Sequence, residues 1–215
     1  MQSLFEKYRP TTFDAILGQD KAVASLRRIQ SRGGFGGRAY WLSGSSGTGK
    51  TTLARLIAGD MAESWHIEEI DAQDCTLDFV RDMERQAAYH GMGAKAGKAW
   101  IINEAHGLRG AVLSRFLTAI ESLPAHCAII FTTTKEGQKD LFGEMADASP
   151  LLSRCMEITL TTRGLADVFA QRVHDIADAE GLNGRPLNWY KRLAMDKRNN
   201  MRAMLSAIEA GEAQV

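Results

Sequence analysis

Short apolar runs alternate with amphipathic stretches along most of the chain. Each run is bounded by glycine or polar residues, which is typical of a buried strand, whereas the stretches between the runs repeat apolar residues at helical spacing. Because no hairpin-turn signals join the runs, the pattern predicts a parallel sheet with helices on both faces, an α/β fold. The predicted strands are 39–42, 65–70, 99–102, 128–131 and 156–160, and the predicted helices are 20–32, 52–58, 77–88 and 111–122.

The pattern changes after Thr161. Beyond this residue the apolar positions follow a helical period without further strand-like runs, which predicts a small helical domain. We therefore expect two domains, residues 1–161 and residues 162–215. Ahead of the first helix, Pro10 and Gly18 exclude one continuous helix over the polar opening segment. The helices expected in the second domain are 163–180, 186–195 and 199–210.

Composition sets broad limits on function. The chain has 215 residues, of which 45% are hydrophobic and 24% are charged, as in an ordinary soluble globular protein. A formal net charge of +0 excludes a uniformly basic nucleic-acid binder but allows a local basic patch. No apolar run approaches the ~20 residues of a membrane span, and the N-terminus lacks the apolar core of a secretion signal. The wide spacing of the cysteines predicts reduced thiols in a cytoplasmic protein rather than a zinc site or a disulfide: Cys75, Cys127 and Cys155.

A phosphate-binding loop follows the first predicted strand and precedes a helix. It fits the pattern G-x-x-x-x-G-K-[ST] without a mismatch. Glycines let the backbone turn successive N–H groups inward, and the helix that follows directs its positive dipole end to the same place. The lysine supplies an ammonium to the outer phosphates, and the threonine hydroxyl can bind Mg²⁺. The loop therefore predicts phosphate and Mg²⁺ binding at Gly44, Ser45, Ser46, Gly47, Thr48, Gly49, Lys50, Thr51 and Thr52.

A second chemical site is expected at the end of the strand 99–102, where Asn103 and Glu104 follow. Glu104 is the candidate general base that orients a water for attack on the γ-phosphate. Asn103 stands where such sites usually hold aspartate. Its amide oxygen can accept from a Mg²⁺-bound water but brings no charge. The site therefore either hydrolyses a nucleoside triphosphate such as ATP, or it binds the nucleotide weakly or turns it over slowly. His106 has no second ligand four residues away, which argues against a metal site there.

Further short motifs follow one another along the chain: Glu6-Lys7-Tyr8-Arg9-Pro10, Leu17-Gly18-Gln19, the phosphate loop, Glu104-Ala105-His106, Thr132–Thr134, Ser153-Arg154-Cys155 and Asn200-Met201-Arg202. With these motifs the chain resembles the ATPase subunits of DNA polymerase sliding-clamp loaders, within the AAA+ class. Its counterparts there are the small subunits of replication factor C and the bacterial gamma/tau subunit. The resemblance covers residues 4–213, and the opening motif together with the triplet at 153–155 makes it far more specific than a phosphate loop alone.

The resemblance implies an AAA+ core with a five-stranded parallel sheet in the order 5-1-4-3-2, followed by a three-helix lid. It implies that Arg154 is an arginine finger acting in trans, that Thr133 senses the γ-phosphate, and that Arg202 is the sensor arginine of the lid. Each residue also has a structural alternative. Thr133 could be an ordinary β-branched strand residue, Arg154 could form a surface ion pair, and Arg202 could be a solvated charge on the last helix. The resemblance also implies that a further group packs around the adenine: Tyr8, Arg9, Pro10, Ile16 and Leu17.

Partners follow from the same resemblance. It implies other AAA+ subunits in a homo- or hetero-oligomer of five or six chains, a sliding clamp, and primed or duplex DNA. Phosphate contacts need only positive charge and N–H groups, so no base-reading signature is expected, and solvated arginines are the alternative at each position. The candidate DNA residues are Thr76, Arg81, Arg109 and Arg115. A separate basic set on the lid is a possible interface: Arg185, Lys191, Arg192, Lys197 and Arg198.

The chain departs from the clamp-loader pattern in several places. Asn103 replaces the usual aspartate, and the connection 135–149 is longer than the family's usual link. The bacterial subunit's cysteine zinc module is missing. The chain also stops at Val215, where clamp-loader subunits continue into a helical collar domain. We therefore expect either a truncated piece of such a subunit or a stand-alone AAA+ module.

Three other functions compete with a clamp-loader ATPase. One is another DNA-acting AAA+ ATPase, of the branch-migration or transposition-regulator type. The second, prompted by Asn103, is a structural subunit that binds nucleotide without hydrolysing it. The third is a simple P-loop kinase, for which the lid and the triplet at 153–155 would have no use.

Overall fold

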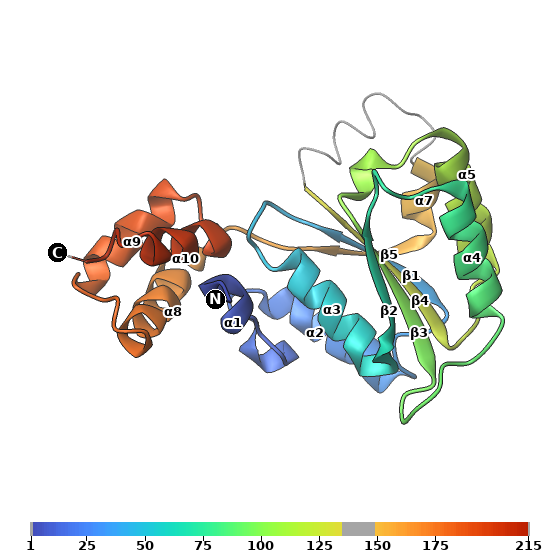
Figure 1. Cartoon of the computed structure of the whole chain (residues 1–215), viewed down its shortest axis with the longest axis horizontal. Coiled ribbons are helices and arrows are strands. Elements are labelled where there is room, and N and C mark those ends of the chain that lie inside the picture. Colours follow the sequence, from blue (N-terminus) through green and yellow to red (C-terminus); the bar gives the residue numbers. More distant parts are fainter. Residues whose placement is uncertain (1, 135–148, 215) are drawn as a thin grey trace. The chain divides into compact units, whose positions relative to one another are not determined.

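A parallel sheet forms the centre of the larger part of the molecule (Figure 1). The computed structural model describes residues 2–134 and 149–214, so the predicted connection 135–149 lies outside the described residues except for Ser149. Within them, five strands pair in the order β2-β3-β4-β1-β5. This is the predicted order 5-1-4-3-2, which confirms the fold class. The strands are β1 (Arg38–Ser43), β2 (Ala62–Asp71), β3 (Gly97–Asn103), β4 (Cys127–Thr133) and β5 (Cys155–Thr159).

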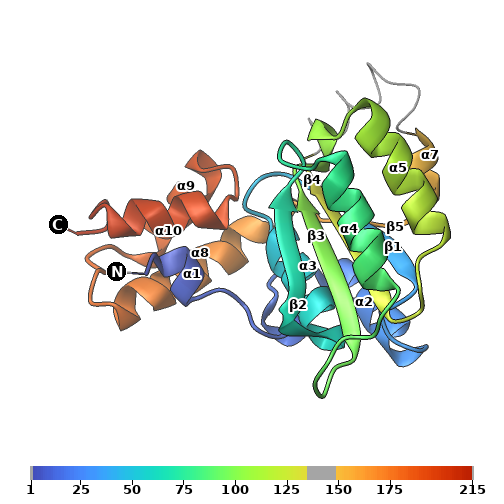
Figure 2. The same ribbon diagram turned by 45° about the vertical axis from the view of Figure 1, so that its right-hand side comes forward.

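Helices cover both faces of this sheet (Figures 1 and 2). On one face α3 contacts β2, β3 and β4, and α2 lies beside it. On the other face α4 packs against α5, and α5 against α7. Layers of this kind bury the strands on both sides, as the apolar runs predict. The helices are α2 (Asp20–Ser31), α3 (Lys50–Met61), α4 (Leu77–Ala87), α5 (Gly110–Glu121) and α7 (Ser149–Ser153), with a 3₁₀ turn η2 (Ala105–Gly107).

The edge strand β2 is longer than its predicted extent of 65–70. It begins at Ala62, directly after α3, and its pairing with β3 is irregular between Ala62 and Ile67. Edge strands have one solvent-facing side and tolerate polar residues, so hydrophobic patterning detects them poorly. Backbone pairing to β3 therefore extends β2 through residues that the pattern leaves out.

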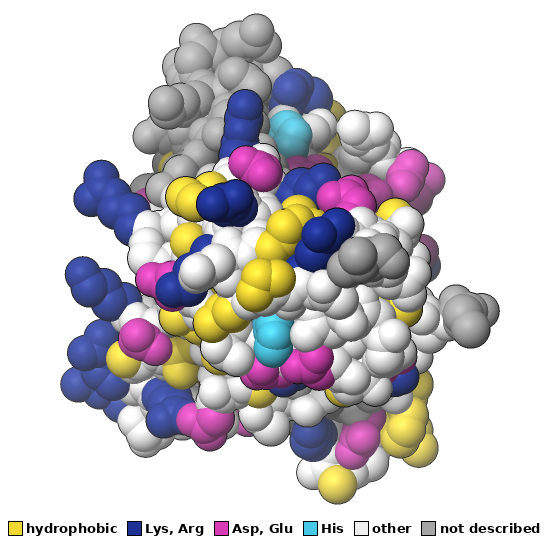
Figure 3. Space-filling model, turned by 90° about the vertical axis from the view of Figure 1, so that its left-hand side faces the viewer, with side chains coloured by type: hydrophobic (Ala, Val, Ile, Leu, Met, Phe, Trp, Pro, Cys, Tyr) yellow, Lys and Arg dark blue, Asp and Glu magenta, His cyan; other side chains and the backbone are white. Residues whose placement is uncertain are grey.

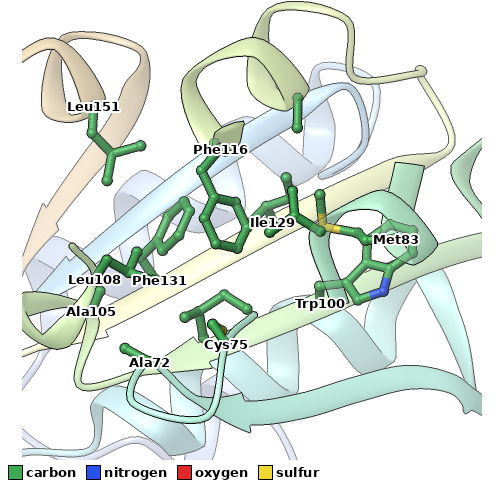
Figure 4. Packing of buried hydrophobic residues seen from close by; sticks show 14 of the residues in the cluster. Ala72, Cys75, Met83, Trp100, Ala105, Leu108, Phe116, Ile129, Phe131 and Leu151 are labelled. Atoms are coloured by element: carbon green, nitrogen blue, oxygen red, sulfur yellow. The ribbon is translucent and has the colours of Figure 1, made fainter. Parts of the chain in front are cut away.

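An apolar cluster fixes the ends of β3 and β4 (Figure 4). Trp100 and Ile102 from β3 and Phe131 from β4 are buried in it. Phe116 of α5 meets Phe131 edge to ring with the ring centroids 5.4 Å apart. This packing holds the ends of both strands in place. It therefore also positions the polar residues at those strand ends, which form part of the candidate site.

A second compact unit contains the C-terminal helices α8 (Leu165–Ala179), α9 (Leu187–Asp196) and α10 (Met201–Glu209). The opening segment belongs to it too, as a short helix α1 (Leu4–Lys7) and a 3₁₀ turn η1 (Phe13–Ala15) broken as the pattern predicts. The unit comprises the residues up to Val23, Ser45–Gly49 and the residues from Leu160 onward. The first unit comprises Ala24–Gly44 and Lys50–Thr159.

Leu4 joins the apolar core of the second unit, beside Phe169, Tyr190 and Leu205. Its backbone N–H also donates to Glu209 Oε1 at 2.6 Å. The opening motif is therefore built into the helical unit by both burial and hydrogen bonding, although it lies far from α8–α10 in the sequence.

Charges on the surface are mixed. On the face drawn in Figure 3, Lys and Arg side chains alternate with Asp, Glu and hydrophobic side chains. In the basic set proposed as an interface, Lys191 pairs with Asp167 at 2.8 Å and Lys197 lies 3.5 Å from Glu212. These ion pairs reduce the net positive charge that the set presents to a partner.

Within the described part of the chain, no helix has the length and apolar character needed to cross a bilayer. The cysteines Cys75, Cys127 and Cys155 are free thiols. Burial raises the pKa of Cys75 and of Cys155 to about 12 and that of Cys127 to about 11. The reactive thiolate is therefore scarce at neutral pH, and these residues contribute packing rather than thiol chemistry.

Candidate functional site

The candidate site of the first unit lies at the carboxyl ends of the central strands. β1 ends at Ser43 and β4 at Thr133, and these two residues are paired in register. β3 ends at Asn103, opposite Asp71 of β2. Ligand sites in open parallel sheets form at this edge because the loops that leave the strands meet there.

The phosphate loop leaves β1 and enters α3, as predicted. Gly47 and Gly49 have φ values of +72° and +101°, in the left-handed region that favours glycine. Thr48 Oγ1 donates to the Ser45 carbonyl at 2.7 Å and closes the turn. The space beside Gly49, where a Cβ would stand, is open within 4 Å. The loop therefore has the tight turn and the uncrowded backbone that a phosphate cradle requires.

Lys50 begins α3 and is buried, and its Nζ donates to the Gly44 carbonyl at 3.0 Å. The ammonium thus reaches back across the loop from the helix N-terminus, where the dipole also favours anions. Thr52 is buried in the same first turn, whereas Ser46 is exposed at the loop tip.

Gly47 is also fixed by its neighbour Asn200, which belongs to the same compact unit. The Met201 N–H donates to the Gly47 carbonyl at 3.3 Å, and a Cβ on Gly47 would stand 1.9 Å from Asn200 Oδ1. Asn200 in turn caps α10, its Oδ1 accepting from the Ala203 N–H at 3.1 Å. A side chain at position 47 would therefore disturb the start of α10 as well as the loop.

Asn103 lies at the centre of a polar network. Its Oδ1 accepts from Thr132 Oγ1 at 2.9 Å and lies 3.4 Å from Thr51 Oγ1. Its Nδ2 donates to Glu69 Oε1 at 2.8 Å. The amide therefore has its oxygen toward the two hydroxyl groups and its NH₂ toward an acid. Thr51 and Asn103 were predicted together as the Mg²⁺ ligands, and Thr132 only as a member of the motif Thr132–Thr134. Glu69 has no local sequence signal that would predict its place in this network.

Glu104 has a left-handed backbone, with φ 49° and ψ 46°. Such a conformation is uncommon for a residue with a side chain and clusters at functional sites. Its Oε2 lies 3.4 Å from His106 Nδ1, which is 3.2 Å from Thr133 Oγ1. The candidate base and the candidate sensor are thus linked through His106, a residue for which the sequence suggested no role besides an unsupported metal site.

Arg154 follows α7 on the surface of the first unit. Its Nε donates to Glu121 Oε1 at 2.7 Å and its Nη1 to the Pro150 carbonyl at 3.0 Å. The side chains of Arg154 and Glu121 are 36% and 57% exposed. Exposed ion pairs of this kind contribute only about 0–1 kcal/mol, so this pairing holds the guanidinium weakly.

Of the residues expected around the adenine, Tyr8 is tied to the helical unit. Its hydroxyl donates to Glu180 Oε1 at 2.5 Å, and the Arg172 guanidinium lies 5.8 Å from its ring centre. The hydrogen bond to Glu180 raises the pKa of Tyr8, while the bonds from Lys7 and Tyr8 lower that of Glu180. The other members of the set are partly or fully buried, with Arg9 donating to Glu6 Oε2 at 3.0 Å: Arg9, Pro10, Ile16 and Leu17.

Arg202, the candidate lid sensor, lies on α10 with its guanidinium 5.0 Å from the centre of the Phe5 ring. A cation over an aromatic face contributes about 0.5–1 kcal/mol at an exposed site. The contact joins the candidate sensor to the opening segment inside the second unit.

The candidate DNA residues already have partners within the chain. Thr76 caps α4, accepting from the Phe79 N–H at 3.1 Å, and Arg81 pairs with Asp78 at 2.9 Å. Arg115 Nε donates to Glu84 at 3.1 Å, and Arg109 donates to the Leu108 carbonyl at 2.9 Å. The bonds of Arg81 and Arg115 to carboxylates are exposed, so they hold these two guanidinium groups weakly, whereas the bond of Arg109 is partly buried.

The donor set around the loop fits a nucleotide with Mg²⁺. Backbone N–H groups and the Lys50 ammonium suit phosphate oxygens, and the oxygen atoms of Thr51 and Asn103 suit Mg²⁺. In the described part of the chain, no cluster of three or more His, Cys, Asp or Glu side chains offers an alternative metal centre.

Comparison with known proteins identifies the family. The family model described as "ATPase family associated with various cellular activities" (AAA) matches residues 40–159, more than half of the 215 residues. The chain belongs to the AAA family. The match runs from β1 to the end of β5 and therefore covers the phosphate loop, Asn103, Glu104 and Arg154.

Curated AAA relatives confirm the resemblance to clamp-loader subunits. The DNA polymerase III subunit tau of Bacillus subtilis is 26% identical over 84% of this chain and 34% of its own length. The replication factor C small subunit of Haloarcula marismortui is 28% identical over 82% of this chain and 52% of its own length. The chain thus spans between a third and about half of these relatives.

Solved AAA structures share the fold. RuvB from Thermotoga maritima, described as a Holliday junction branch migration motor, has a TM-score of 0.65 and 23% identity, covering 94% of this chain and 64% of RuvB. A DNA polymerase III gamma subunit-related protein from the same organism has a TM-score of 0.54 and 15% identity, covering 82% and 56%. At these identities the likeness concerns the fold alone.

Proposed function

We propose that this chain is an ATP-dependent switch of the sliding-clamp-loader type, which binds and hydrolyses ATP at subunit interfaces to load or remodel a clamp on DNA. The observation that carries the proposal is the meeting of Thr51, Asn103 and Thr132 in one polar network at the carboxyl edge of the sheet. It occurs in a member of the AAA family whose curated relatives include clamp-loader subunits.

In this proposal the loop N–H groups and Lys50 hold the phosphates, while Thr51 and Asn103 offer their oxygen atoms to Mg²⁺. When bound, Mg²⁺ neutralises charge on the phosphate oxygens. Glu104 holds the attacking water and accepts its proton, a role that contributes about 10²–10⁴-fold in rate. His106 lies near both Glu104 and Thr133 and positions the base relative to the sensor.

Two charges complete the site. Arg202 closes over the phosphates as the lid sensor, and Arg154 reaches the nucleotide of a neighbouring subunit. To do so Arg154 leaves Glu121, which is a small cost for an exposed pair. The adenine packs against the segment that contains Tyr8 and Leu17. Functionally, residues 1–161 are the nucleotide-binding core and 162–215 the lid, although the opening residues of the core pack with the lid helices in one compact unit.

The proposed partners are other AAA+ subunits in an assembly of five or six, a sliding clamp, and primed or duplex DNA. The DNA backbone is bound through the N-terminal part of α4 and the start of α5, which carry Thr76, Arg81, Arg109 and Arg115. Contacts to phosphates alone should give weak sequence preference and strong salt dependence.

The proposal is tested by measuring ATP turnover per chain over a range of protein concentrations, with and without primed DNA. Turnover should rise with protein concentration because each site needs a second subunit, and should rise further with primed DNA. Turnover per chain that is constant across the range and indifferent to DNA would contradict a switch of this type.

A further inference from the structure

An acid–amide pair lies at the edge of the candidate site. Glu69, on β2, accepts the Asn103 amide at Oε1. The same carboxylate also accepts from Arg55 of α3, whose Nε donates to Oε2 at 2.7 Å and whose Nη2 donates to Oε1 at 3.2 Å. The side chain of Glu69 is 26% exposed. Its position is therefore set by two partners on different elements.

The partners fix which way the amide faces. A carboxylate can only accept, so it requires the NH₂ end of Asn103, while hydroxyl groups of Thr132 and Thr51 face the oxygen. Turning the amide over would place its oxygen against the carboxylate oxygen of Glu69. The network thus fixes the amide in one orientation, with its oxygen facing Thr51 in the first turn of α3.

An aspartate at position 103 would fit this network badly. Its carboxylate has no N–H to give to Glu69, so two acidic oxygens would meet at the place where the structure has a 2.8 Å hydrogen bond. Like charges at hydrogen-bond distance repel, also near the surface. Asparagine at 103 and glutamate at 69 are therefore complementary, and the acid of the pair is on β2 instead of β3.

We propose that Glu69 is a positioning residue of the nucleotide site. By accepting from the Asn103 amide nitrogen, its carboxylate orients the Asn103 oxygen toward Thr51. This inference rests on the proposed function. It gives Asn103 a role as one half of a matched pair, in which the carboxylate belongs to β2 and the amide to β3. Arg55 keeps that carboxylate in place.

A double-mutant cycle tests the pair: wild type, Glu69→Gln, Asn103→Asp, and the double variant, in which acid and amide exchange positions. Two quantities are measured, the Mg²⁺ concentration that half-saturates binding of a fluorescent ATP analogue and the melting temperature without nucleotide. Glu68→Gln is the control, because strand alternation turns the neighbouring side chain to the opposite face of β2.

Each single variant should raise the half-saturating Mg²⁺ concentration about tenfold, a size typical of coupled polar pairs, and the double variant should return close to wild type. Asn103→Asp alone should lower the melting temperature, and adding Glu69→Gln should restore it. The proposal would be overturned if Asn103→Asp alone lowered the half-saturating Mg²⁺ concentration and Glu69→Gln left it unchanged. Such a result would show that Asn103 acts only as a weaker substitute for an aspartate ligand.

The two readouts separate this inference from the proposed function. If wild type binds no nucleotide at any Mg²⁺ concentration, the proposed function fails. The melting temperatures still test the pair in that case, because strictly additive shifts in the cycle would show that Glu69 and Asn103 do not act together.

Discussion

Replacing Arg154 with alanine is expected to reduce ATP turnover of the assembled protein about 10³-fold, the usual contribution of an arginine finger. The guanidinium stabilises charge that develops on the transferring phosphoryl group, so the loss should appear in turnover and not in the affinity of the isolated chain for ATP. Steady-state hydrolysis and equilibrium binding of a fluorescent ATP analogue measure the two quantities.

Two variants serve as controls for Arg154→Ala. A 10³-fold loss corresponds to about 4 kcal/mol, whereas the exposed pair with Glu121 is worth about 0–1 kcal/mol. Glu121→Gln, which removes only the pair, should therefore leave turnover near wild type. Arg85→Ala removes another exposed, ion-paired arginine and should do the same. Equal turnover in Arg154→Ala and wild type would exclude the finger role.

Glu104→Gln is expected to lower turnover about 10²–10⁴-fold while ATP binding persists. Glutamine keeps the size of the side chain and its approach to His106, but it cannot accept the proton of the attacking water. The same assays apply, with a single-turnover measurement to show that the chemical step is the one affected.

The control for Glu104 is Glu157→Gln, which removes an exposed carboxylate from β5. It should hydrolyse ATP at the wild-type rate. If Glu104→Gln retains wild-type turnover, another group must orient the water, and the strained backbone at 104 would then need a different explanation.

Much of the fold follows from local patterning. The buried strands β1, β3 and β4 are short apolar runs, and the phosphate loop is specified by its own glycines and lysine. The sheet order came from the resemblance to clamp-loader subunits, since periodicity does not say which strands are neighbours. β2 was found only in part, because an edge strand is held by backbone pairing that leaves little trace in hydrophobicity.

The site was harder to predict where it depends on contacts across strands. Considered without its neighbours, Asn103 suggests a weakened metal ligand. Its partner Glu69 could not be predicted, because it belongs to a strand whose register the sequence does not reveal. Likewise, nothing local indicates that His106 lies between Glu104 and Thr133, or that Glu104 has a left-handed backbone. These features arise from tertiary packing.

The most direct test of a site shared between subunits is to mix the two inactive variants, Glu104→Gln and Arg154→Ala. In a mixed assembly, a chain that retains Glu104 can receive the finger of a chain that retains Arg154. Random one-to-one mixing would place that combination at about one quarter of the junctions, so turnover should return to about a quarter of wild type. A mixture no more active than the variants measured separately, under conditions where wild type hydrolyses ATP, would contradict the shared site.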